Sequence, residues 1–399
     1  MLASLLPLRS FIVRLAFVFQ KLLLAASFLI FRWLPRKAPS GQPWVVGVDE
    51  IAANVFNIGE VLSPAITVSF SRHPFYDYKY DHCPSVRNRF LMYVVRALYG
   101  PVLLGYLTNK ADAFFYVGGS GFLVNEVDGR AYEFAFLKKR GKRVVCYFCG
   151  SEIRSIKLME EFSRKQDIDV VTTYQVIAQP FIASDYKERI RYLLATSANR
   201  YADHIFNAPV DQMSYIERDV HPFMYFHPAR HFRRRDEKFS GAGPVKILHA
   251  PSSPLIKGTP LVRAAIKKLK LEGYRFEYKE LIGVPNTVVL EELGNAHIVL
   301  NEFYAFVPGQ FGVEAMAAHC ALLTSADEHI EPSLPAGSNQ AWSVTRYWEI
   351  YDKLKALLDD PGLIKSYADA GYDWAEKNCT YDVSSRRLRS ILGLGSVVG

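Results

Sequence analysis

The sequence predicts an α/β protein with two domains, each built on a parallel sheet with crossover helices. In both halves of the chain, short apolar runs alternate with segments of helical length and pattern, which is typical of parallel strands joined by helices. The 399 residues suffice for two ordinary domains, and half of them are hydrophobic. At 227–243 the composition changes to His, Arg, Gly and Ser, which predicts an interdomain linker.

The individual elements follow from the spacing of apolar residues. In the first half we predict strands at 44–48, 65–70, 113–117 and 143–148, and helices at 91–106 and 132–139. In the second half we predict strands at 245–249, 275–281, 297–300 and 321–324, and helices at 260–271, 288–293 and 311–319. Three further predicted helices, 344–358, 362–378 and 383–392, close the chain.

These elements divide the chain into five parts. An N-terminal anchor (1–40) precedes the first domain (44–226), the linker (227–243) and the second domain (244–380). The last part, 381–399, is predicted as a helix that either stays with the second domain or crosses back to the first.

The first 40 residues contain six basic side chains and no acid. Without those six charges the other 359 residues have a net charge of +2 rather than +8, which argues against nucleic-acid binding and for a membrane surface. At about 100° per residue, Ser10, Arg14, Lys21 and Arg32 fall on one narrow stripe, with a weaker polar line beside it. The weaker line consists of Arg9, Gln20 and Ser27. The opposite face is apolar and consists of Ile12, Leu15, Phe19, Leu23, Ile30 and Trp33.

We interpret residues 8–34 as a helix that lies in, or re-enters, the cytoplasmic face of a membrane. Its longest uncharged run, 22–31, has ten residues, whereas a spanning helix needs about 20. A tilted spanning helix is the second option, with Arg36 and Lys37 on the cytoplasmic side. A cleaved signal peptide is disfavoured because charges interrupt the apolar region. A buried core helix would have to hide two arginines and a lysine.

The cysteines and the short motifs typical of metal sites indicate no disulfide scaffold, redox centre or metal site. The five cysteines form an odd and sparse set, which fits a reducing compartment and argues against a disulfide scaffold. Cys146 and Cys149 form one C-x-x-C without a second pair, so we expect them to pack in the core. Asp167 and Asp169 match the metal-binding pattern D-x-D, but they follow the polar residues 164–166, and we regard the match as chance. We therefore predict no metal site and no required cofactor.

The loop after the strand 245–249 is the first candidate binding site. It runs from His249 through Ser252 and Ser253 to Lys257, Gly258 and Thr259, followed by Pro260. Thr259 is a good N-cap and Pro260 a natural first helical residue, so Lys257 should stand just before a helix N-terminus. A cation there, with free backbone N–H groups, suits a diphosphate. A surface lysine beside an ordinary capped helix is the alternative.

A second loop leads from the strand 297–300 into the helix 311–319. It contains Gly309, Gln310 and Gly312, and Glu314 is expected in the first helical turn. Glycines let a backbone approach a ligand closely, and a glutamate can accept hydrogen bonds from ribose or sugar hydroxyls. For Glu314 taken alone, a favourable interaction with the helix dipole is the simpler explanation. Both loops follow the carboxyl ends of parallel strands, where open α/β sheets bind ligands.

These two loops resemble those of the retaining GT-B glycosyltransferases of family 4. In that family a strand leads to K-G, and a later loop leads to G-x-x-x-x-E-A-M-A; here Gly309 and Glu314 match the second pattern, 57 positions after Lys257. The resemblance implies two Rossmann-like domains facing across a cleft. It also implies that Lys257 neutralises the departing nucleotide diphosphate and that Glu314 holds the ribose or donor sugar.

Three positions depart from the family pattern. Phe306 stands where the family has a first glutamate, Ser252 where it has an arginine, and His319 where it has a glycine. Ser252, Ser253, Gly309 and Gln310 are candidate substitutes as phosphate or sugar contacts, and His249 is expected near them.

The first domain would receive the acceptor, as the resemblance implies. Gly119 and Ser120 lie in a glycine-rich turn after the strand 113–117, and Glu152 and Arg154 resemble part of the family's G-S-D-I-R segment. We expect all four on the acceptor side. A bare glycine turn and a structural ion pair are the alternative explanations.

Together these observations predict a glycosyltransferase at the cytoplasmic face of a membrane. It would transfer a sugar from a nucleotide-sugar donor to a lipid-linked or glycan acceptor in surface polysaccharide biosynthesis, with retention of anomeric configuration. The alternative is a catalytically impaired GT-B subunit that binds a nucleotide sugar or glycan and supports a partner enzyme. A GT-B nucleotide-sugar epimerase is a third option.

Overall fold

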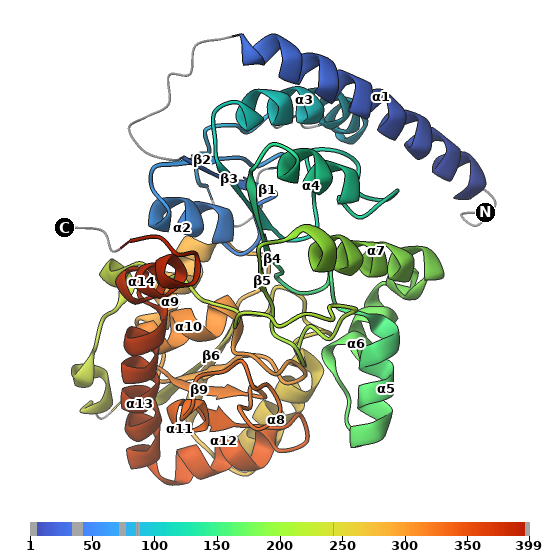
Figure 1. Ribbon diagram of the computed structural model, residues 1–399. Helices are drawn as coiled ribbons and strands as arrows, with labels where there is room; N and C mark the ends of the chain where they lie inside the picture. The colour runs from blue at the N-terminus through green and yellow to red at the C-terminus, as the bar shows by residue number, and fades with distance from the viewer. Residues whose placement is uncertain are drawn as a thin grey trace. The chain divides into compact units, whose positions relative to one another are not determined.

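The computed structural model describes residues 6–33, 43–71, 77–84, 86, 88–241 and 243–395, and it divides the chain into two compact units (Figure 1). The first unit contains residues 1–155, 185–207 and 214–223, and the second contains 156–184, 208–213 and 224–399. Each unit is built on its own five-stranded parallel sheet, as the sequence predicts.

The sheet of the first unit has the strand order β2-β1-β3-β4-β5. Its strands are β1 (Trp44–Val48), β2 (Ala65–Thr67), β3 (Ala113–Val117), β4 (Arg143–Tyr147) and β5 (His204–Phe206). Every residue of β1 and β3 is buried, which explains their unbroken apolar sequences, because helices cover both faces of a parallel sheet. In register, Trp44 of β1 lies beside Ala65 of β2 and Ala113 of β3.

Helices of the first unit connect these strands and cover the sheet. They are α1 (Leu6–Arg32), α2 (Asn54–Val61), α3 (Arg89–Thr108), α4 (Ala131–Lys138) and α7 (Asp185–Tyr201). The core between helices and sheet includes Leu104, Phe114, Phe134 and Ala198, each almost fully buried.

The second unit repeats this plan with the strand order β10-β9-β8-β6-β7. Its strands are β6 (Val245–His249), β7 (Phe276–Glu280), β8 (Ile298–Leu300), β9 (Ala321–Thr324) and β10 (Ser343–Val344). Its helices are α5 (Ile156–Gln166), α6 (Val171–Ala178), α8 (Thr259–Leu271), α9 (Asn286–Leu293), α10 (Gly309–Ala317), α11 (Ser338–Ala341), α12 (Ile350–Asp359), α13 (Pro361–Cys379) and α14 (Tyr381–Ile391). Short 3-10 turns lie at Pro180–Ala183, Ala229–His231 and Asp236–Phe239.

The second unit begins much earlier in the chain than the predicted second domain, which starts at 244, and the predicted linker 227–243 lies within this unit. Helices α5 and α6 group with it, since Met159 and Val170 form an apolar cluster with Phe306. The sequence gives no sign of this, because a helix does not reveal which sheet it will cover. Helix α14 also belongs to the second unit, where Ser384 donates a hydrogen bond to the carbonyl of Tyr225 (2.7 Å).

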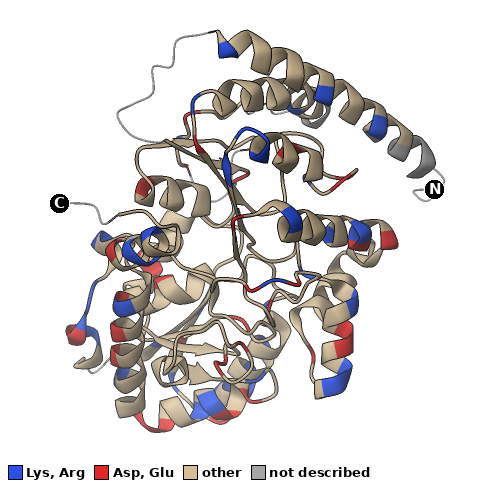
Figure 2. Cartoon of the chain, in the orientation of Figure 1, with Lys and Arg blue, Asp and Glu red and all other residues tan. Residues whose placement is uncertain are grey.

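Helix α1 packs lengthwise on the first unit beside α3 (Figure 1). Phe17 and Leu24 are buried, and Phe17 and Phe28 make edge-to-face ring contacts with Tyr132 and Phe136. The two helices show few charges, and none of the α1 charges is acidic (Figure 2). The predicted apolar face stays open: Ile12, Leu15, Phe19 and Ile30 are at least half exposed, and Trp33 is 86% exposed.

The weaker polar line of α1 turns toward the protein. Gln20 donates to the carbonyl of Ala97 (3.1 Å) and accepts from the backbone N–H of Val124 (2.9 Å), and Ser27 donates to the carbonyl of Pro101 (3.3 Å). These contacts explain the polar residues on that line, because a buried amide or hydroxyl needs hydrogen-bond partners. The side chains of Arg9 and Ser10 lie outside the described residues.

Candidate functional site

The Lys257 loop leaves the carboxyl end of β6 and leads into α8. Gly258, with φ of 80°, is the N-cap of α8, and Thr259 is its first residue, so the predicted N-cap at Thr259 is wrong by one position. A left-handed N-cap favours glycine because it has no Cβ. The Thr259 hydroxyl does not cap the helix; it is buried and bonds His249 instead.

His249 supports the loop from the interior of the second unit. It is fully buried, with Nδ1 2.7 Å from the Leu300 carbonyl oxygen and Nε2 2.9 Å from Thr259 Oγ1. Burial lowers the pKa of its imidazole to about 4, so the ring is neutral. Because both nitrogens are occupied, His249 does not reach a ligand, contrary to its predicted donor contact. It fixes the start of α8.

Lys257 is held by an acid that the sequence reading missed. Its Nζ forms an ion pair with Glu302, two residues after the end of β8, and the side chains of Lys257 and Glu302 are 28% and 6% exposed. Ser252 is exposed at the start of the loop, and the carbonyl of Ser253 accepts from the Lys257 backbone N–H (3.0 Å). The pair therefore places an accessible cation and a carboxylate at the carboxyl edge of the sheet.

The loop before α10 approaches this pair closely. A Cβ added to Gly309, whose φ is 63°, would lie 3.0 Å from a carboxylate oxygen of Glu302. The Gly309 N–H donates to the Tyr225 hydroxyl (3.1 Å). Asn301 donates to the carbonyl of Pro308 (2.7 Å), and a Cβ on Gly312 would lie 3.0 Å from Asn301 Nδ2. Both glycines are thus needed for the N-terminus of α10 to lie against the strand end.

Glu314 lies in the second turn of α10, because the helix begins at Gly309 and not at the predicted 311. Both oxygens of its carboxylate accept from Asn286 Nδ2, at 3.2 and 3.3 Å. Burial raises the pKa of Glu314 to about 7, although hydrogen bonds from Asn286 and Gln310 act in the opposite direction. The group is therefore poised to lose or gain a proton near neutral pH when its surroundings change.

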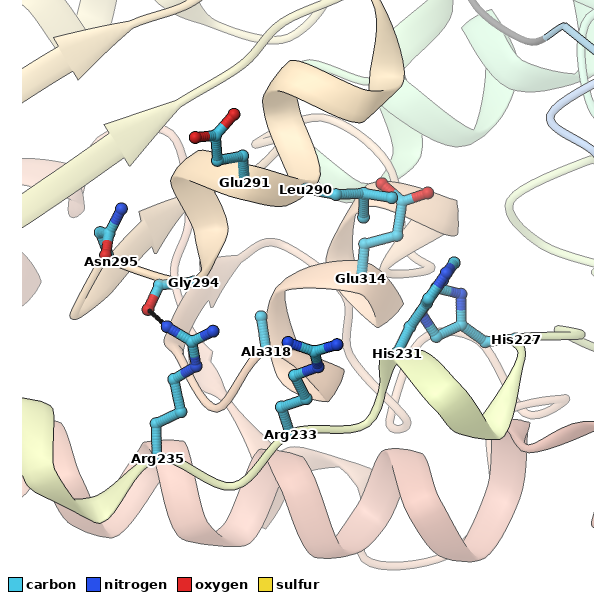
Figure 3. Close-up of a pocket in the computed structure, with 10 residues that line it drawn as sticks. All are labelled: His227, His231, Arg233, Arg235, Leu290, Glu291, Gly294, Asn295, Glu314 and Ala318. Atoms are coloured by element: carbon cyan, nitrogen blue, oxygen red, sulfur yellow. Dashed lines mark hydrogen bonds between the residues drawn. The ribbon is translucent and has the colours of Figure 1, made fainter.

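Glu314 also borders a pocket of about 380 Å³. The pocket is lined by α9, α10 and the segment 227–235, with His227, His231, Arg233 and Arg235 on the last of these. Figure 3 shows the Arg233 side chain between those of Arg235 and His231, with Arg235 extending to the carbonyl of Gly294, to which it donates a hydrogen bond (3.2 Å). Burial lowers the pKa of His227 to about 3. Gln310 lies 3.3 Å from His227 Nδ1 and so joins the pocket to the first turn of α10.

The structure therefore places four of the predicted donor-site residues in two neighbouring groups along α10. Lys257, Glu302 and Gly309 gather at its N-terminus, whereas Gln310 and Glu314 face Asn286 and the pocket. Glu302 and Asn286 were missed. The signal for Glu302 was an acid two residues after the end of a predicted strand, in the same loop as Gly309.

Two of the departures from the family pattern have clear structural explanations. His319 has φ of 63°, the conformation for which the family's glycine is suited. Here its buried ring receives the Arg235 backbone N–H on Nδ1 (3.0 Å) and contacts Asp369 through Nε2 (2.7 Å). Phe306 is buried beside Phe162 in the apolar cluster, so it offers no group to a sugar.

The predicted acceptor-side residues lie at the carboxyl edge of the first sheet. Glu152 accepts from the Cys149 N–H at 2.5 Å, and a Cβ on Gly119 would lie 3.0 Å from the Glu152 side chain. The Gly119 carbonyl accepts from Asn125, and that of Ser120 from the buried Arg130. Arg154 is buried. The turn and the 149–154 segment are therefore in contact.

Three aspartates outside these loops, Asp169, Asp236 and Asp369, bond to neighbouring side chains. Asp169 accepts from the Tyr174 hydroxyl (2.8 Å). Among the described residues, Asp236, His319 and Asp369 come close enough to hold a metal ion. Lys365 already bridges the two aspartates at 2.8 Å, so this cluster is neutralised by a lysine.

Comparison with known proteins supports the architecture. No family model and no curated protein matches the sequence. Among solved structures, the chain is similar to a sucrose-phosphate synthase from Thermosynechococcus elongatus, with a TM-score of 0.60 and 10% identity over 88% of this chain and 98% of that chain. It is also similar to WaaG, a glycosyltransferase involved in lipopolysaccharide biosynthesis, with a TM-score of 0.53 and 10% identity over 88% of this chain and 100% of WaaG. The fold is that of the GT-B glycosyltransferases.

Proposed function

We propose that the protein is a retaining glycosyltransferase that moves a sugar from a nucleotide-sugar donor to a membrane-bound or lipid-linked acceptor in surface-glycan assembly. The observation that carries this proposal is the Lys257–Glu302 pair beside the N-terminus of α10. In this transfer the bond from the anomeric carbon to the diphosphate breaks, and an acceptor oxygen takes its place.

Lys257 and the N-terminus of α10 supply positive charge where the diphosphate departs. A helix N-terminus and an ammonium group both stabilise the negative charge that develops on the leaving group, without a required metal. In the absence of a donor, Glu302 neutralises Lys257. When a diphosphate takes over Lys257, the Glu302 carboxylate becomes available to accept hydrogen bonds from sugar hydroxyls.

Glu314, in the second turn of α10, would bind the ribose or the donor sugar. A buried carboxylate with an amide partner can accept hydrogen bonds from adjacent hydroxyl groups. Such bonds favour the charged form, so donor binding near pH 7 should release protons from Glu314.

The membrane part of the proposal rests on α1. Its apolar face is exposed along most of its length, and Phe11–Arg32 and Leu91–Thr108 are both long and apolar enough to cross a membrane by length and composition. The packing of α1 along the first unit favours the in-plane arrangement. The cytoplasmic face is proposed because the donor is a soluble nucleotide sugar.

A second candidate function is a nucleotide-sugar-binding subunit without turnover. Phe306 favours it, because a buried phenyl ring stands where the resembled family has a carboxylate. In our proposal, Glu302 supplies the carboxylate that the resembled family has at the position of Phe306. Sugar transfer from a labelled donor by the purified full-length protein in the presence of membrane extract would exclude this candidate.

The test of the donor site is a binding screen with UDP-, GDP- and ADP-sugars followed by Lys257→Ala. Loss of the phosphate contact should weaken the best-bound donor by roughly tenfold or more, equivalent to about 1.4 kcal/mol. Lys279→Ala is the matched control, because Lys279 is also in an ion pair, with Glu292. Equal donor affinity in Lys257→Ala and the unmodified protein would remove the central assignment.

A further inference from the structure

Helices α1 and α3 share a broad apolar surface, which we call the α1–α3 surface. Its exposed side chains include Phe11, Leu15 and Leu22 of α1 and Leu91, Val94 and Leu98 of α3, each 47% exposed or more except Val94 at 37%. Val94 lies one turn before Ala97, whose carbonyl bonds Gln20 of α1, so the exposed positions of α3 border the seam between the helices. An apolar surface this large on a folded unit indicates a binding face.

The two helices run in the same direction. Gln20 contacts Ala97, Ser27 contacts Pro101, and Phe31 packs on Tyr106. Helix α3 follows β2 and precedes β3 in a parallel sheet, so its first half lies at the carboxyl edge of the sheet. The hydrogen bond from Val124, in the loop after β3, to Gln20 places the middle of α1 near that same edge.

The carboxyl edge beside α3 holds an accessible ion pair. Asp49 follows β1, and its Oδ2 lies 2.9 Å from Arg96 Nη2; the two side chains are 19% and 31% exposed. Ser71, beyond β2, lies 3.5 Å from the other Asp49 oxygen, and Arg96 lies over the Phe70 ring. An arginine has five N–H donors, so Arg96 can bind an anion while it keeps Asp49.

Arg96 and the exposed apolar residues occupy opposite faces of α3. At about 100° per residue, Val94 and Leu98 both lie roughly 160° from Arg96. A helix with side chains is about 10–12 Å across, and an interfacial helix sinks its apolar face about 5–10 Å below the lipid head groups. The Arg96 side of α3 would then stand at the level of the head groups.

The charges near the surface favour an anionic bilayer over a protein partner. Arg14, Lys21 and Arg32 lie on α1, and residues 6–33 contain no acid. Basic side chains at the margin of an apolar face bind lipid phosphates while their stems stay among the acyl chains.

We propose that the α1–α3 surface rests on a bilayer and that the Asp49–Arg96 pair binds the head group of the lipid acceptor. Arg96 binds a head-group phosphate, and Asp49 accepts a hydrogen bond from a head-group hydroxyl. The role of this head group as sugar acceptor rests on the proposed function, whereas the binding step does not.

The first test measures vesicle binding by the full-length protein in sedimentation. The probe is phosphatidylglycerol and phosphatidylcholine vesicles in a 3:7 ratio. Val94→Glu/Leu98→Glu should lower the partition coefficient by roughly tenfold or more, since two glutamates would enter the apolar interface. Leu271→Glu is the matched control, because Leu271 is 75% exposed on α8 of the second unit. A folded α3 variant, verified by thermal melting, that binds like this control would overturn the proposed surface.

The second test separates the head-group site from the surface. Vesicles with 30% phosphatidylglycerol present phosphate and hydroxyls, whereas those with 30% phosphatidic acid present phosphate without the glycerol hydroxyls. The unmodified protein should prefer the first by roughly threefold or more, and Asp49→Asn should remove this preference without weakening binding to phosphatidic acid. A preference that is absent, or that persists in Asp49→Asn, contradicts the assignment.

Arg96→Gln tests the phosphate contact separately. It should weaken binding to both vesicle types by a similar factor of roughly three, while Arg143→Gln, on β4, changes neither. Since neither test uses a nucleotide sugar, failure of the donor screen would leave these results standing. Unchanged binding by a folded Arg96→Gln variant would remove Arg96 from the site.

Discussion

The carboxyl edges of the two sheets differ in what surrounds them. The edge of the second unit presents the Lys257–Glu302 pair against the glycine-rich start of α10. The edge of the first unit presents Asp49–Arg96 beside two helices with exposed apolar faces. In our proposals, one architecture built twice therefore binds a soluble anion at one edge and an amphiphile at the other. The difference comes from the loops and helices added to each sheet, not from the sheets.

The first prediction sharpens this comparison by testing whether α1 is part of the first unit or a detachable anchor. Leu24 is fully buried, whereas Leu22 on the same helix is 67% exposed. Leu24→Asp should destabilise the first unit by roughly 3–5 kcal/mol, because it buries an unpaired carboxylate. Leu22→Asp should change stability by about 0.5 kcal/mol or less.

Urea unfolding in detergent-free buffer measures both variants. Equal stabilities for Leu24→Asp and Leu22→Asp would mean that α1 contributes no core to the first unit. Helix α1 would then be an appendage that is not part of the first unit, and the comparison between the two edges would fail.

The second prediction concerns the pH dependence of the second unit. Burial raises the pKa of Glu314 from 4.5 to about 7, so the folded state binds a proton more tightly than the unfolded state. This contribution to stability is fully present below about pH 4.5 and is lost as the pH rises to about 7. Glu314→Gln should therefore be more stable than the unmodified protein by about 1 kcal/mol at pH 5 and by about 3 kcal/mol at pH 8.

The measurement is urea unfolding at pH 5, 6, 7 and 8 for both proteins, without a ligand. A difference between them that stays constant across this range would show that Glu314 keeps its ordinary pKa, and its proposed proton release on donor binding would then be withdrawn.

The third and smallest effect concerns Glu302, which we expect to compete with the donor diphosphate for Lys257. Glu302→Gln should bind UDP roughly three- to tenfold more tightly, about 1 kcal/mol, because a negative charge beside the diphosphate is removed. The same variant should transfer sugar more slowly if Glu302 binds the donor hydroxyls. Calorimetry with UDP gives the first value; weaker binding would mean that Glu302 supports the phosphate site instead.

Much of the fold could be predicted because its strands are buried on both faces. The predicted strands 44–48, 113–117 and 321–324 coincide with β1, β3 and β9, since a short apolar run between polar turns has few other interpretations. The predicted strand 245–249 also coincides with β6, although its second residue, Lys246, is exposed. Strand β5 was missed because three residues, His204–Phe206, give no recognisable pattern. The assignment of α5 and α6 to the second unit depends on contacts with Phe306, which is distant in sequence.

The sequence by itself determined the two parallel sheets, the apolar face of α1 and the loops that carry Lys257 and Glu314, because periodicity and turn residues are local properties. Only the tertiary structure decided that Glu302 pairs with Lys257, that His249 is a buried support and that α3 extends the apolar surface of α1. Each of these depends on residues that are far apart in the chain: the first two meet when parallel strands align their carboxyl ends, and the third when two helices pack side by side. A one-dimensional pattern cannot specify which loops will share an edge.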